Sequence, residues 1–384
     1  YFLENLMPQT DILIIGGSSS GLSVAGALAQ YGIQPTILDA DAQSGDVWRK
    51  RYDRLHLHTI KGLSHSAYKK LPNTLPRYVP KDEFADYLTR YANELNADIH
   101  HNTRVTRIAK SQSAPYRYHV ETESGDTWEA RHCVIATGIN RTPFIPDWQG
   151  IDSFNGRLMH ACEHKTGKDF AGKRVLVVGI GNSGAEISAD CAEQGASVVH
   201  SSIRTFPMIV KLDPFGIPVH VWGVILFPFP TSFKDWVVNS LAKVEIGDLS
   251  RYGIQQPAWN VFGDKRIPMI DVGYVDQLKA GTISVKPDIA CFTPDGVEFT
   301  DGEQVAYDVV IAATGYRTGL EKIMDISGVI DEDGTVTEPN GAPTSHAGLW
   351  FVGLINSPAG VLMAARIQAR NIAKAIAEAE GITV

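Results

Sequence analysis

Two glycine-rich stretches decide the fold: Gly16-Gly17-Ser18-Ser19-Ser20-Gly21 and Gly179-Ile180-Gly181-Asn182-Ser183-Gly184. Each directly follows a short apolar run, residues 11–15 in one case and 175–178 in the other. Such a run is typical of a buried parallel strand. Glycines behind it allow a tight turn, after which the first amides of a helix face a pyrophosphate. The sequence therefore predicts an α/β protein with two Rossmann-like dinucleotide-binding domains.

The residues behind the first turn indicate which nucleotide it binds. Asp39 follows Gly21 at about the distance at which such units place a carboxylate for a ribose hydroxyl. This suits FAD, whose adenosine carries no 2′-phosphate. Ser18 replaces the middle glycine, and its side chain either weakens flavin binding or donates to a phosphate oxygen; the sequence leaves both open. The predicted FAD residues here are Gly16, Gly17, Ser18, Ser19, Ser20, Gly21 and Asp39.

The second turn is followed by hydroxyl and guanidinium side chains, where the first is followed by a carboxylate. After the expected helix 185–194 and strand 197–199, no carboxylate stands at the strand end. Hydroxyls and a guanidinium follow instead, and the arginine fork matches phosphate geometry. We therefore predict NADPH, although a merely solvated Arg204 remains the alternative. The predicted contacts are Gly179, Gly181, Asn182, Ser183, Gly184, Ser201, Ser202 and Arg204.

The composition limits the class of protein to which the chain can belong. The chain has 384 residues, 44% of them hydrophobic and 20% charged, which suits two globular domains. A net charge of -8 argues against a nucleic-acid partner. The four cysteines form no Cys-x-x-Cys pair, so we expect neither a zinc site nor a redox disulfide and place the protein in the cytoplasm.

One apolar segment stands apart from this pattern. Residues 215–230 are almost free of charge but are broken repeatedly by proline, so we expect no transmembrane segment. The segment could line an apolar substrate passage or touch a membrane surface. Buried packing is the preferred interpretation.

An internal repeat organises the chain. A strand followed by Ala-Thr-Gly occurs at 136–138 and again at 313–315. We therefore expect the NADPH domain, 151–304 with a substrate-side insertion at about 205–270, to be inserted in a FAD domain made of 7–150 and 305–384. In the last part, 348–353 and a long amphipathic helix from Ala359 resemble the segment that closes over the flavin ring in two-domain flavoproteins.

Several motifs resemble the flavin-containing monooxygenase family, the class B flavoprotein monooxygenases. Phe154, Gly156 and His160 fit the Phe-x-Gly-x-x-x-His core of its fingerprint, although His164 stands where the pattern ends in an aromatic residue. The Ala-Thr-Gly-Tyr at 313–316 is similar to that of the same family. Stretches at 52–61, 78–92 and 160–184 are similar to the YUCCA branch. The resemblance extends over most of the chain and is weakest at 211–265.

The resemblance implies an NADPH- and O2-dependent cycle through a C4a-(hydro)peroxyflavin that NADP+ shields. The substrate would be a small organic molecule, oxidised at nitrogen, sulfur or an indole, or at a carbonyl such as an α-keto acid. The alternative is an NADPH-dependent flavin reductase related to thioredoxin reductase but without its redox disulfide. A third hypothesis is a nucleotide-binding module without activity. A homodimer is left open.

The resemblance also assigns residues. Thr59, His58 and Lys61 would lie beside the flavin, with ordinary loop packing as the alternative. Asn140 would lie near both cofactors, with a plain turn residue as the alternative. For His160 a structural role in the connection is preferred to proton donation. Further contacts are expected for FAD from Trp48, Thr137, Gly138 and Gly353, and for NADPH from Thr314, Gly315 and Tyr316.

Overall fold

The computed structural model describes residues 8–95, 97–331, 334–355, 357 and 360–382. The chain forms two compact units. The first contains the chain up to Lys50, Thr59–Thr142 and the chain from Tyr316, and the second contains Arg51–His58 and Pro143–Gly315. Within the described residues, no helix is long and apolar enough to cross a membrane.

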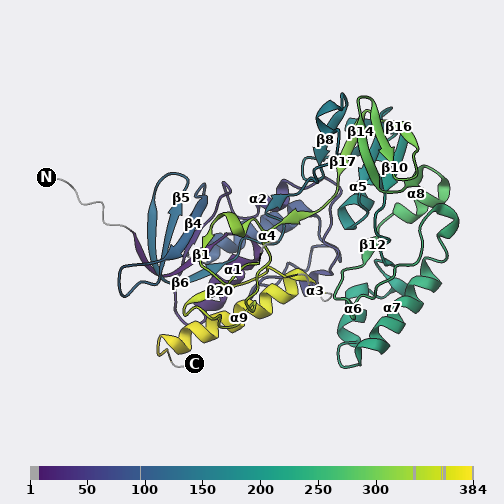
Figure 1. Cartoon of the computed structure of the whole chain (residues 1–384). Coiled ribbons are helices and arrows are strands. Elements are labelled where there is room, and N and C mark those ends of the chain that lie inside the picture. Colours follow the sequence, from purple (N-terminus) through teal and green to yellow (C-terminus); the bar gives the residue numbers. More distant parts are fainter. Residues whose placement is uncertain (1–7, 96, 332–333, 356, 358–359, 383–384) are drawn as a thin grey trace. The chain divides into compact units, whose positions relative to one another are not determined.

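The first unit is built on a sheet with a parallel part and an antiparallel part (Figure 1). The parallel strands run in the order β20-β6-β1-β2-β3, and β4 and β5 continue antiparallel from the first half of β6. The strands are β1 (Gln9–Ile15), β2 (Thr36–Leu38), β3 (Asp98–His100), β4 (Val105–Lys110), β5 (Tyr118–Thr122), β6 (Thr127–Ile135), β19 (Met324–Asp325) and β20 (Leu349–Phe351).

Apolar helices cover this sheet. Helix α1 begins inside the glycine turn and has small and aliphatic side chains throughout, so it is buried almost all round. The long α9 packs against it with a stripe of alanine and isoleucine that recurs every three or four residues. The helices of this unit are α1 (Ser19–Ala29), α2 (Asp46–Arg49), α3 (Lys61–Ser64), α4 (Lys81–Glu94) and α9 (Val361–Ala379).

The second unit has a five-stranded parallel sheet in the order β13-β10-β9-β17-β8. Two smaller sheets accompany it, antiparallel β14-β15-β16 and parallel β11-β12. The strands are β8 (Arg157–His160), β9 (Arg174–Val178), β10 (Val198–Ser202), β11 (Ile209–Lys211), β12 (Met269–Asp271), β13 (Ile283–Lys286), β14 (Ile289–Thr293), β15 (Gly296–Phe299), β16 (Gln304–Ala306) and β17 (Val309–Ala312). The crossing segments β7 (Thr142–Pro143) and β18 (Tyr316–Arg317) pair with each other.

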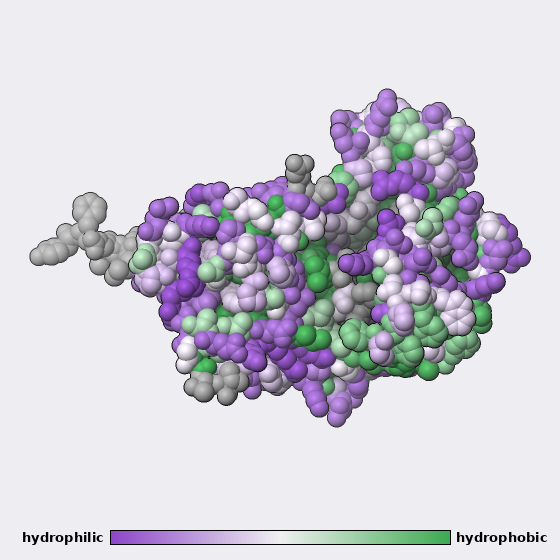
Figure 2. Space-filling model, turned by 60° about the horizontal axis from the view of Figure 1, so that its bottom comes forward, coloured by the Kyte–Doolittle hydropathy of each residue, from purple (hydrophilic) through white to green (hydrophobic). Residues whose placement is uncertain are grey.

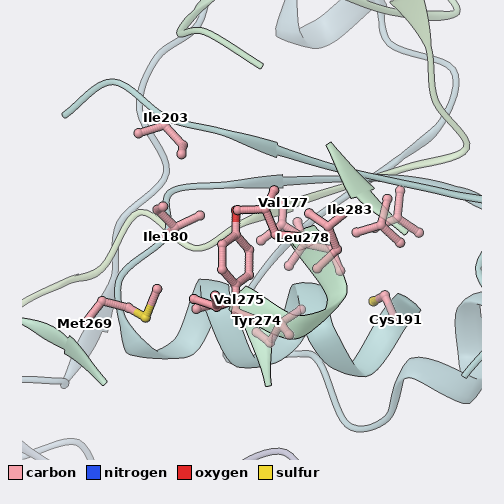
Figure 3. Close-up of a cluster of buried hydrophobic side chains, with 14 of the residues drawn as sticks. Val177, Ile180, Cys191, Ile203, Met269, Tyr274, Val275, Leu278 and Ile283 are labelled. Carbon is pink, nitrogen blue, oxygen red and sulfur yellow. The ribbon is translucent and has the colours of Figure 1, made fainter. Parts of the chain in front are cut away.

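Helices α5 (Asn182–Glu193) and α8 (Tyr274–Ala280) pack on this sheet. Figure 3 shows part of the core that these helices and the sheet form, where the buried Tyr274 ring points towards the strand that carries Val177. Cys191, Leu278 and Ile283 belong to the same buried cluster. This packing fixes α5, the helix that starts at the second glycine turn. Short 3-10 helices of the second unit lie at Ile151–Ser153, Gly167–Phe170, Pro214–Gly216 and Ser250–Tyr252, and one of the first unit lies at Leu320–Lys322.

The apolar segment 215–230 is not buried as preferred from the sequence. It forms α6 (Val219–Ile225) and the connection to α7 (Thr231–Glu245), and Phe227, Phe229 and Ile225 are exposed. Figure 2 shows apolar side chains gathered on one face of the molecule. The prolines end and start these helices, so the aromatic side chains fall on a short connection instead of in a packed core.

Some element boundaries also differ from expectation. The helix expected at 185–194 begins three residues earlier, within its glycine motif, and the strand expected at 197–199 extends to Ser202 as β10. Strand β17 pairs in the second unit's sheet, so the chain returns to the first unit at Tyr316, later than residue 305. Helix α9 starts at Val361, and Ala359, Met7 and Val384 lie outside the described residues.

Candidate functional site

The first glycine turn is closed so tightly that side chains are excluded. Gly16 has a φ of 111°, and its N–H donates to Leu38 O at 2.8 Å, which joins the turn to the end of β2. A Cβ on Gly21 would stand 1.9 Å from Gly16 O. Glycine is therefore required at both positions, and the start of α1 is held against the strand edge.

Asp39 lies immediately behind β2, at the edge of this turn. It is 8% exposed, and a Cβ on Gly17 would come within 2.7 Å of its Oδ2. Burial raises the pKa of Asp39, while hydrogen bonds from the backbone N–H of Asp41 and Gly17 act in the opposite direction. A shielded carboxylate at this place is suited to accept hydroxyl donors of a ribose.

Two buried hydroxyls at this edge have no partner among the described residues. They are Ser18 Oγ, in the turn, and Thr137 Oγ1, in the Ala-Thr-Gly that follows β6. Ser18 is the N-cap of α1, but its side chain makes no capping bond. Buried polar atoms normally hydrogen-bond. Both hydroxyls fit a group with oxygen acceptors, and the residues of this edge fit the diphosphate and ribose of FAD.

Gly353 is brought to the same edge by β20. It has a φ of 68°, and its N–H donates to Gln368 Oε1 at 2.8 Å. A Cβ here would meet Ser20 Oγ at 2.3 Å, whereas a Cβ on Gly138 would meet nothing within 4 Å. Trp48 lies on α2 in the same unit, edge-on to Phe84 with ring centroids 4.9 Å apart. The first turn, Asp39, Thr137 and Gly353 thus surround one edge of the sheet.

The second turn repeats the geometry of the first. Gly179 has a φ of 93°, its N–H donates to Ser202 O at 2.9 Å, and a Cβ on Gly184 would stand 1.9 Å from Gly179 O. A Cβ on Gly181 would meet no atom within 4 Å. The middle glycine is therefore not required by the protein's own packing, and it leaves the backbone open to a pyrophosphate.

Equivalent hydrogen bonds align the two units residue by residue. Gly16 binds the carbonyl of Leu38 and Gly179 binds that of Ser202, so Ile203 stands where Asp39 stands in the first unit. An apolar side chain with 6% exposure replaces the ribose carboxylate. This site is free of the negative charge that would repel a 2′-phosphate.

The same alignment changes the expected phosphate ligands. The Ser201 hydroxyl is fully buried and hydrogen-bonds Ser188 Oγ at 3.1 Å, and Ser202 Oγ donates to Pro287 O at 2.7 Å. Both lie inside β10, because the strand is longer than expected. Arg204, just beyond it, is exposed and makes no hydrogen bond or ion pair within the described part of the chain. Of the three residues predicted to bind the 2′-phosphate of NADPH, Arg204 is therefore the one that stays a candidate.

The other residues expected to contact NADPH differ in whether their side chains are already engaged within the protein. Asn182 Oδ1 accepts the N–H of Ile270 at 2.7 Å, which ties the turn to β12. Thr314 Oγ1 donates to Phe144 O. Gly315, in the second unit, has a φ of 88° with open space around its Cα. Tyr316 begins the return to the first unit.

The fingerprint residues have structural roles in the second unit. A Cβ on Gly156 would lie 2.3 Å from the Phe154 ring and 2.9 Å from Asp308 O. His160 Nδ1 accepts the N–H of Cys162, and its Nε2 donates to Gly315 O at 2.9 Å. Burial lowers the pKa of His160, in keeping with this neutral tautomer. His160 therefore positions the Ala-Thr-Gly turn.

A buried polar cluster that the sequence did not reveal lies on α5. Glu186 is 3% exposed, its Oε1 is 2.6 Å from His58 Nε2, and it also hydrogen-bonds Tyr52. Ser183 hydrogen-bonds the same phenol, and burial followed by the Glu186 charge raises the pKa of Tyr52 well above its usual value. The only sequence signal was a glutamate among the apolar residues of an otherwise buried helix.

The four expected catalytic side chains are not brought together in one unit. His58 belongs to the second unit, and the other three belong to the first. Thr59 Oγ1 is 2.6 Å from Ser64 Oγ, and Lys61 donates to Asn73 O and Leu75 O at 2.8 and 2.7 Å. Asn140 is exposed. Thr59 and Lys61 thus brace the local loop.

Comparisons with known proteins extend over nearly the whole chain. It is 33% identical over 377 residues to the indole-3-pyruvate monooxygenase YUCCA1 of Oryza sativa subsp. japonica, a match covering 95% of this chain and 90% of the relative. The probable indole-3-pyruvate monooxygenase YUCCA9 of Arabidopsis thaliana is 32% identical over 377 residues, with 95% and 88% covered.

Solved structures share the fold. A flavin-containing monooxygenase from Stenotrophomonas maltophilia superposes with a TM-score of 0.74 at 25% identity, covering 97% of this chain and 99% of that one. A cyclohexanone monooxygenase from Rhodococcus sp. Phi1 bound to NADP+ gives a TM-score of 0.76 at 18% identity, with 98% and 85% covered. This second likeness concerns the fold alone.

The two nucleotide turns and the fingerprint thus agree with a match over the whole described fold. The family described as flavin-binding monooxygenase-like matches residues 9–382. The chain belongs to this family, and it is a flavin-dependent monooxygenase that uses FAD, NADPH and O2.

Proposed function

We propose that the enzyme oxidises an α-keto acid of the indole-3-pyruvate type to the carboxylic acid one carbon shorter. The observation that carries this proposal is the end-to-end similarity to relatives named for that substrate, at 31–33% identity. Oxygenation of an amine, a thioether or an indole ring is the competing outcome within the same family.

We assign the first unit's turn to FAD. The amides that open α1 face the diphosphate, Asp39 accepts a ribose hydroxyl, and the hydroxyls of Ser18 and Thr137 donate to phosphate oxygens. The unpartnered state of those two buried hydroxyls supports this assignment. Trp48, Gly138 and Gly353 stay predicted neighbours of the flavin.

We assign the second turn to NADPH. The amides that open α5 hold the pyrophosphate, and Arg204 holds the 2′-phosphate, because Ile203 leaves no carboxylate beside it. His160 fixes Gly315 and its neighbours at the rim of the same sheet. Glu186 hydrogen-bonds both His58 and Tyr52. We propose a positioning role for His58 and, for Asn140, the cofactor contact expected from the sequence.

When both groups are bound, NADPH supplies a hydride and FAD uses it to activate O2. The proposed reaction converts the keto acid, O2, NADPH and a proton to the shortened acid, CO2, NADP+ and water. The bond between the keto carbon and its carboxyl group breaks, one oxygen atom forms a new bond to the keto carbon, and the other leaves as water. The protein binds and orients the reactants and excludes bulk water.

The proposal is tested by comparing substrates under air. NADPH consumption and product should rise together with indole-3-pyruvate and not with a thioether or a tertiary amine of similar size. If only the thioether or the amine stimulates NADPH consumption and product formation, the keto-acid proposal is wrong. The assignment to the monooxygenase family would still hold. Reduction of flavin with transfer only to an artificial acceptor would favour the reductase alternative.

A cytoplasmic location is proposed on the cysteines. All four lie in the described part of the chain and are free, two of them fully buried. Unpaired thiols suit a reducing compartment. Fractionation of cells that carry the native protein would test the location, and release from the periplasm or another oxidising compartment would contradict it.

A further inference from the structure

His101 lies directly after β3, beside the carboxylate at the edge of the first glycine turn. Its Nδ1 is 3.8 Å from Asp39 Oδ2. This nitrogen is buried and has no hydrogen-bond partner among the described residues, although the side chain as a whole is 29% exposed. Buried polar atoms normally have a partner. His101 therefore presents an unused hydrogen-bonding atom next to Asp39.

The gap between these two side chains is wider than in the direct histidine–carboxylate pairs of this protein. His164 Nε2 is 3.0 Å from Asp190 Oδ2, and His58 Nε2 is 2.6 Å from its glutamate. A separation of 3.8 Å is too long for a hydrogen bond. An oxygen atom about 2.8 Å from each of the two side chains fits between them. The spacing therefore suits a hydroxyl group that bridges the imidazole and the carboxylate.

The backbone fixes this spacing. Asp39 N–H donates to His100 O at 2.9 Å, and Thr103 N–H donates to Asp39 O at 2.8 Å. Asn102 N–H donates to Asp41 O at 2.9 Å. These three hydrogen bonds join the loop after β2 to the loop after β3, which carry the carboxylate and the imidazole. The two side chains are therefore held next to each other by the fold of the first unit.

The second unit provides an internal comparison. Ile203 N–H donates to Lys286 O at 2.9 Å, which is the counterpart of the Asp39 bond described above. Pro287 therefore takes the place of His101. Isoleucine and proline side chains have neither a donor nor an acceptor for a hydroxyl. The carboxylate and the imidazole thus occur together in the unit that we assign to FAD, and apolar side chains replace both in the unit that we assign to NADPH.

We propose that His101 is a second ligand of the adenosine ribose of FAD. Its Nδ1–H donates to the oxygen of a ribose hydroxyl, and the same hydroxyl donates its hydrogen to Asp39 Oδ2. The proposal rests on the assignment of the first turn to FAD made above. It makes His101 a determinant of affinity for FAD and of selectivity for an intact ribose, because an analogue without this hydroxyl leaves both side chains without their shared partner.

The test is titration of the deflavinated protein with FAD, followed by flavin fluorescence. His101→Phe removes the donor but keeps an aromatic ring, so the Kd for FAD should rise about threefold to tenfold. His101→Asn keeps an N–H donor in nearly the same position and should stay within about twofold of the wild type. Thermal unfolding of the deflavinated variants reports that each is folded. An unchanged Kd for His101→Phe would overturn the proposal.

The matched control is the same substitution one residue earlier. His100 Nε2 pairs with Asp98 Oδ2 at 3.0 Å, and its ring lies edge-on to Trp128 with centroids 4.8 Å apart. His100→Phe keeps the contact between the rings and should leave the Kd for FAD unchanged. A loss equal to that of His101→Phe would show that any change in β3 disturbs the site, and would contradict a specific role of His101.

Two analogues of FAD identify the hydroxyl. The adenosine of one lacks the 2′-hydroxyl, and that of the other lacks the 3′-hydroxyl. The wild type and His101→Phe should bind one of the two with equal affinity, because the bridging hydroxyl is then missing. A difference between the two proteins that persists with both analogues would mean that His101 does not act through the ribose.

A double-mutant cycle separates this inference from the assignment of the site. Asp39→Asn should weaken FAD binding, and the double variant with His101→Phe should lose less than the two single losses combined, since both side chains bind one hydroxyl. Additive losses, or a loss with Asp39→Asn alone, would refute the role of His101 and leave the FAD assignment standing. If neither single variant changes the Kd, the assignment of the first turn to FAD is wrong as well.

Discussion

His58 Nε2 lies 2.6 Å from Oε1 of Glu186, a carboxylate that is 3% exposed on helix α5. The bond fastens the segment Arg51–His58 to the helix that begins at the second glycine turn. Two further contacts hold the same segment, Asp53 N–H to Lys165 O at 2.9 Å and Arg54 to Glu193 at 2.9 Å. The segment is therefore anchored in the second unit, although residues of the first unit flank it on both sides in the sequence.

His58→Ala should lower the free energy of unfolding by about 2–3 kcal/mol, because the buried Glu186 loses a charge-assisted partner. Urea unfolding followed by fluorescence measures it. Lys374→Ala is the matched control, since it breaks an exposed pair with Glu378 at 3.7 Å and should cost less than about 0.5 kcal/mol. Equal losses of unfolding free energy in the two variants would show that the buried pair stabilises the protein no more than an exposed pair does.

Ser18→Ala should weaken FAD binding about tenfold, because a hydrogen bond to a phosphate oxygen is lost. Titration of the deflavinated protein with FAD measures the affinity. Ser18→Gly restores the common glycine and should also bind FAD less tightly than the wild type. Tighter binding by the glycine variant would show instead that the serine side chain obstructs the cofactor.

Arg204→Ala should reduce kcat/KM for NADPH by about tenfold to a hundredfold and change that for NADH by less than about twofold, since only NADPH carries the 2′-phosphate. Steady-state kinetics with both donors give the ratio. Arg251→Ala, which removes another exposed arginine of the second unit, should leave both values unchanged. A parallel loss for NADPH and NADH would refute the role of Arg204.

Stability should decline in mild acid. Burial lowers the pKa of His200 and of His220 from 6.5 to about 4, with nearby positive charges adding to the effect. Both are neutral in the folded protein, whereas the unfolded chain takes up protons near pH 6.5, so the free energy of unfolding falls as the pH drops from about 6.5 to about 4. Urea midpoints at several pH values measure this decline.

His200→Gln is the variant that isolates one histidine. His200 Nδ1 and the Tyr307 hydroxyl hydrogen-bond at 2.6 Å, and a glutamine amide can keep a hydrogen bond to that hydroxyl. The slope below pH 6.5 should become shallower by about one proton, or about 1.4 kcal/mol per pH unit. An unchanged slope would mean that other groups carry the acid sensitivity.

The glycine turns, the first strands and the order of the two units follow from the sequence, because local apolar runs and glycines dictate them. Ser201 shows the limit of such reasoning. Only the register between β9 and β10 reveals that its hydroxyl points into the protein, and a strand end is poorly marked when serine continues a valine strand. The burial of Glu186 depends on contacts 128 residues apart in sequence, which no local pattern contains.

For the apolar stretch 215–230 the sequence predicted burial, and the structure shows exposed side chains instead. Its composition predicted a core, yet Phe227 is the most exposed large hydrophobic residue of the described chain. Proline placed it at a connection between helices, where no neighbouring element covers it. Composition alone does not distinguish a buried apolar segment from an exposed one.

The most direct test of the proposed function follows the oxygen atoms. The enzyme is mixed with NADPH, indole-3-pyruvate and heavy-isotope O2, and the acid product is weighed by mass spectrometry. The account predicts one labelled oxygen atom in each acid molecule and one NADPH consumed for each molecule formed. An unlabelled acid, or NADPH consumption that yields only hydrogen peroxide while the keto acid is untouched, would contradict it.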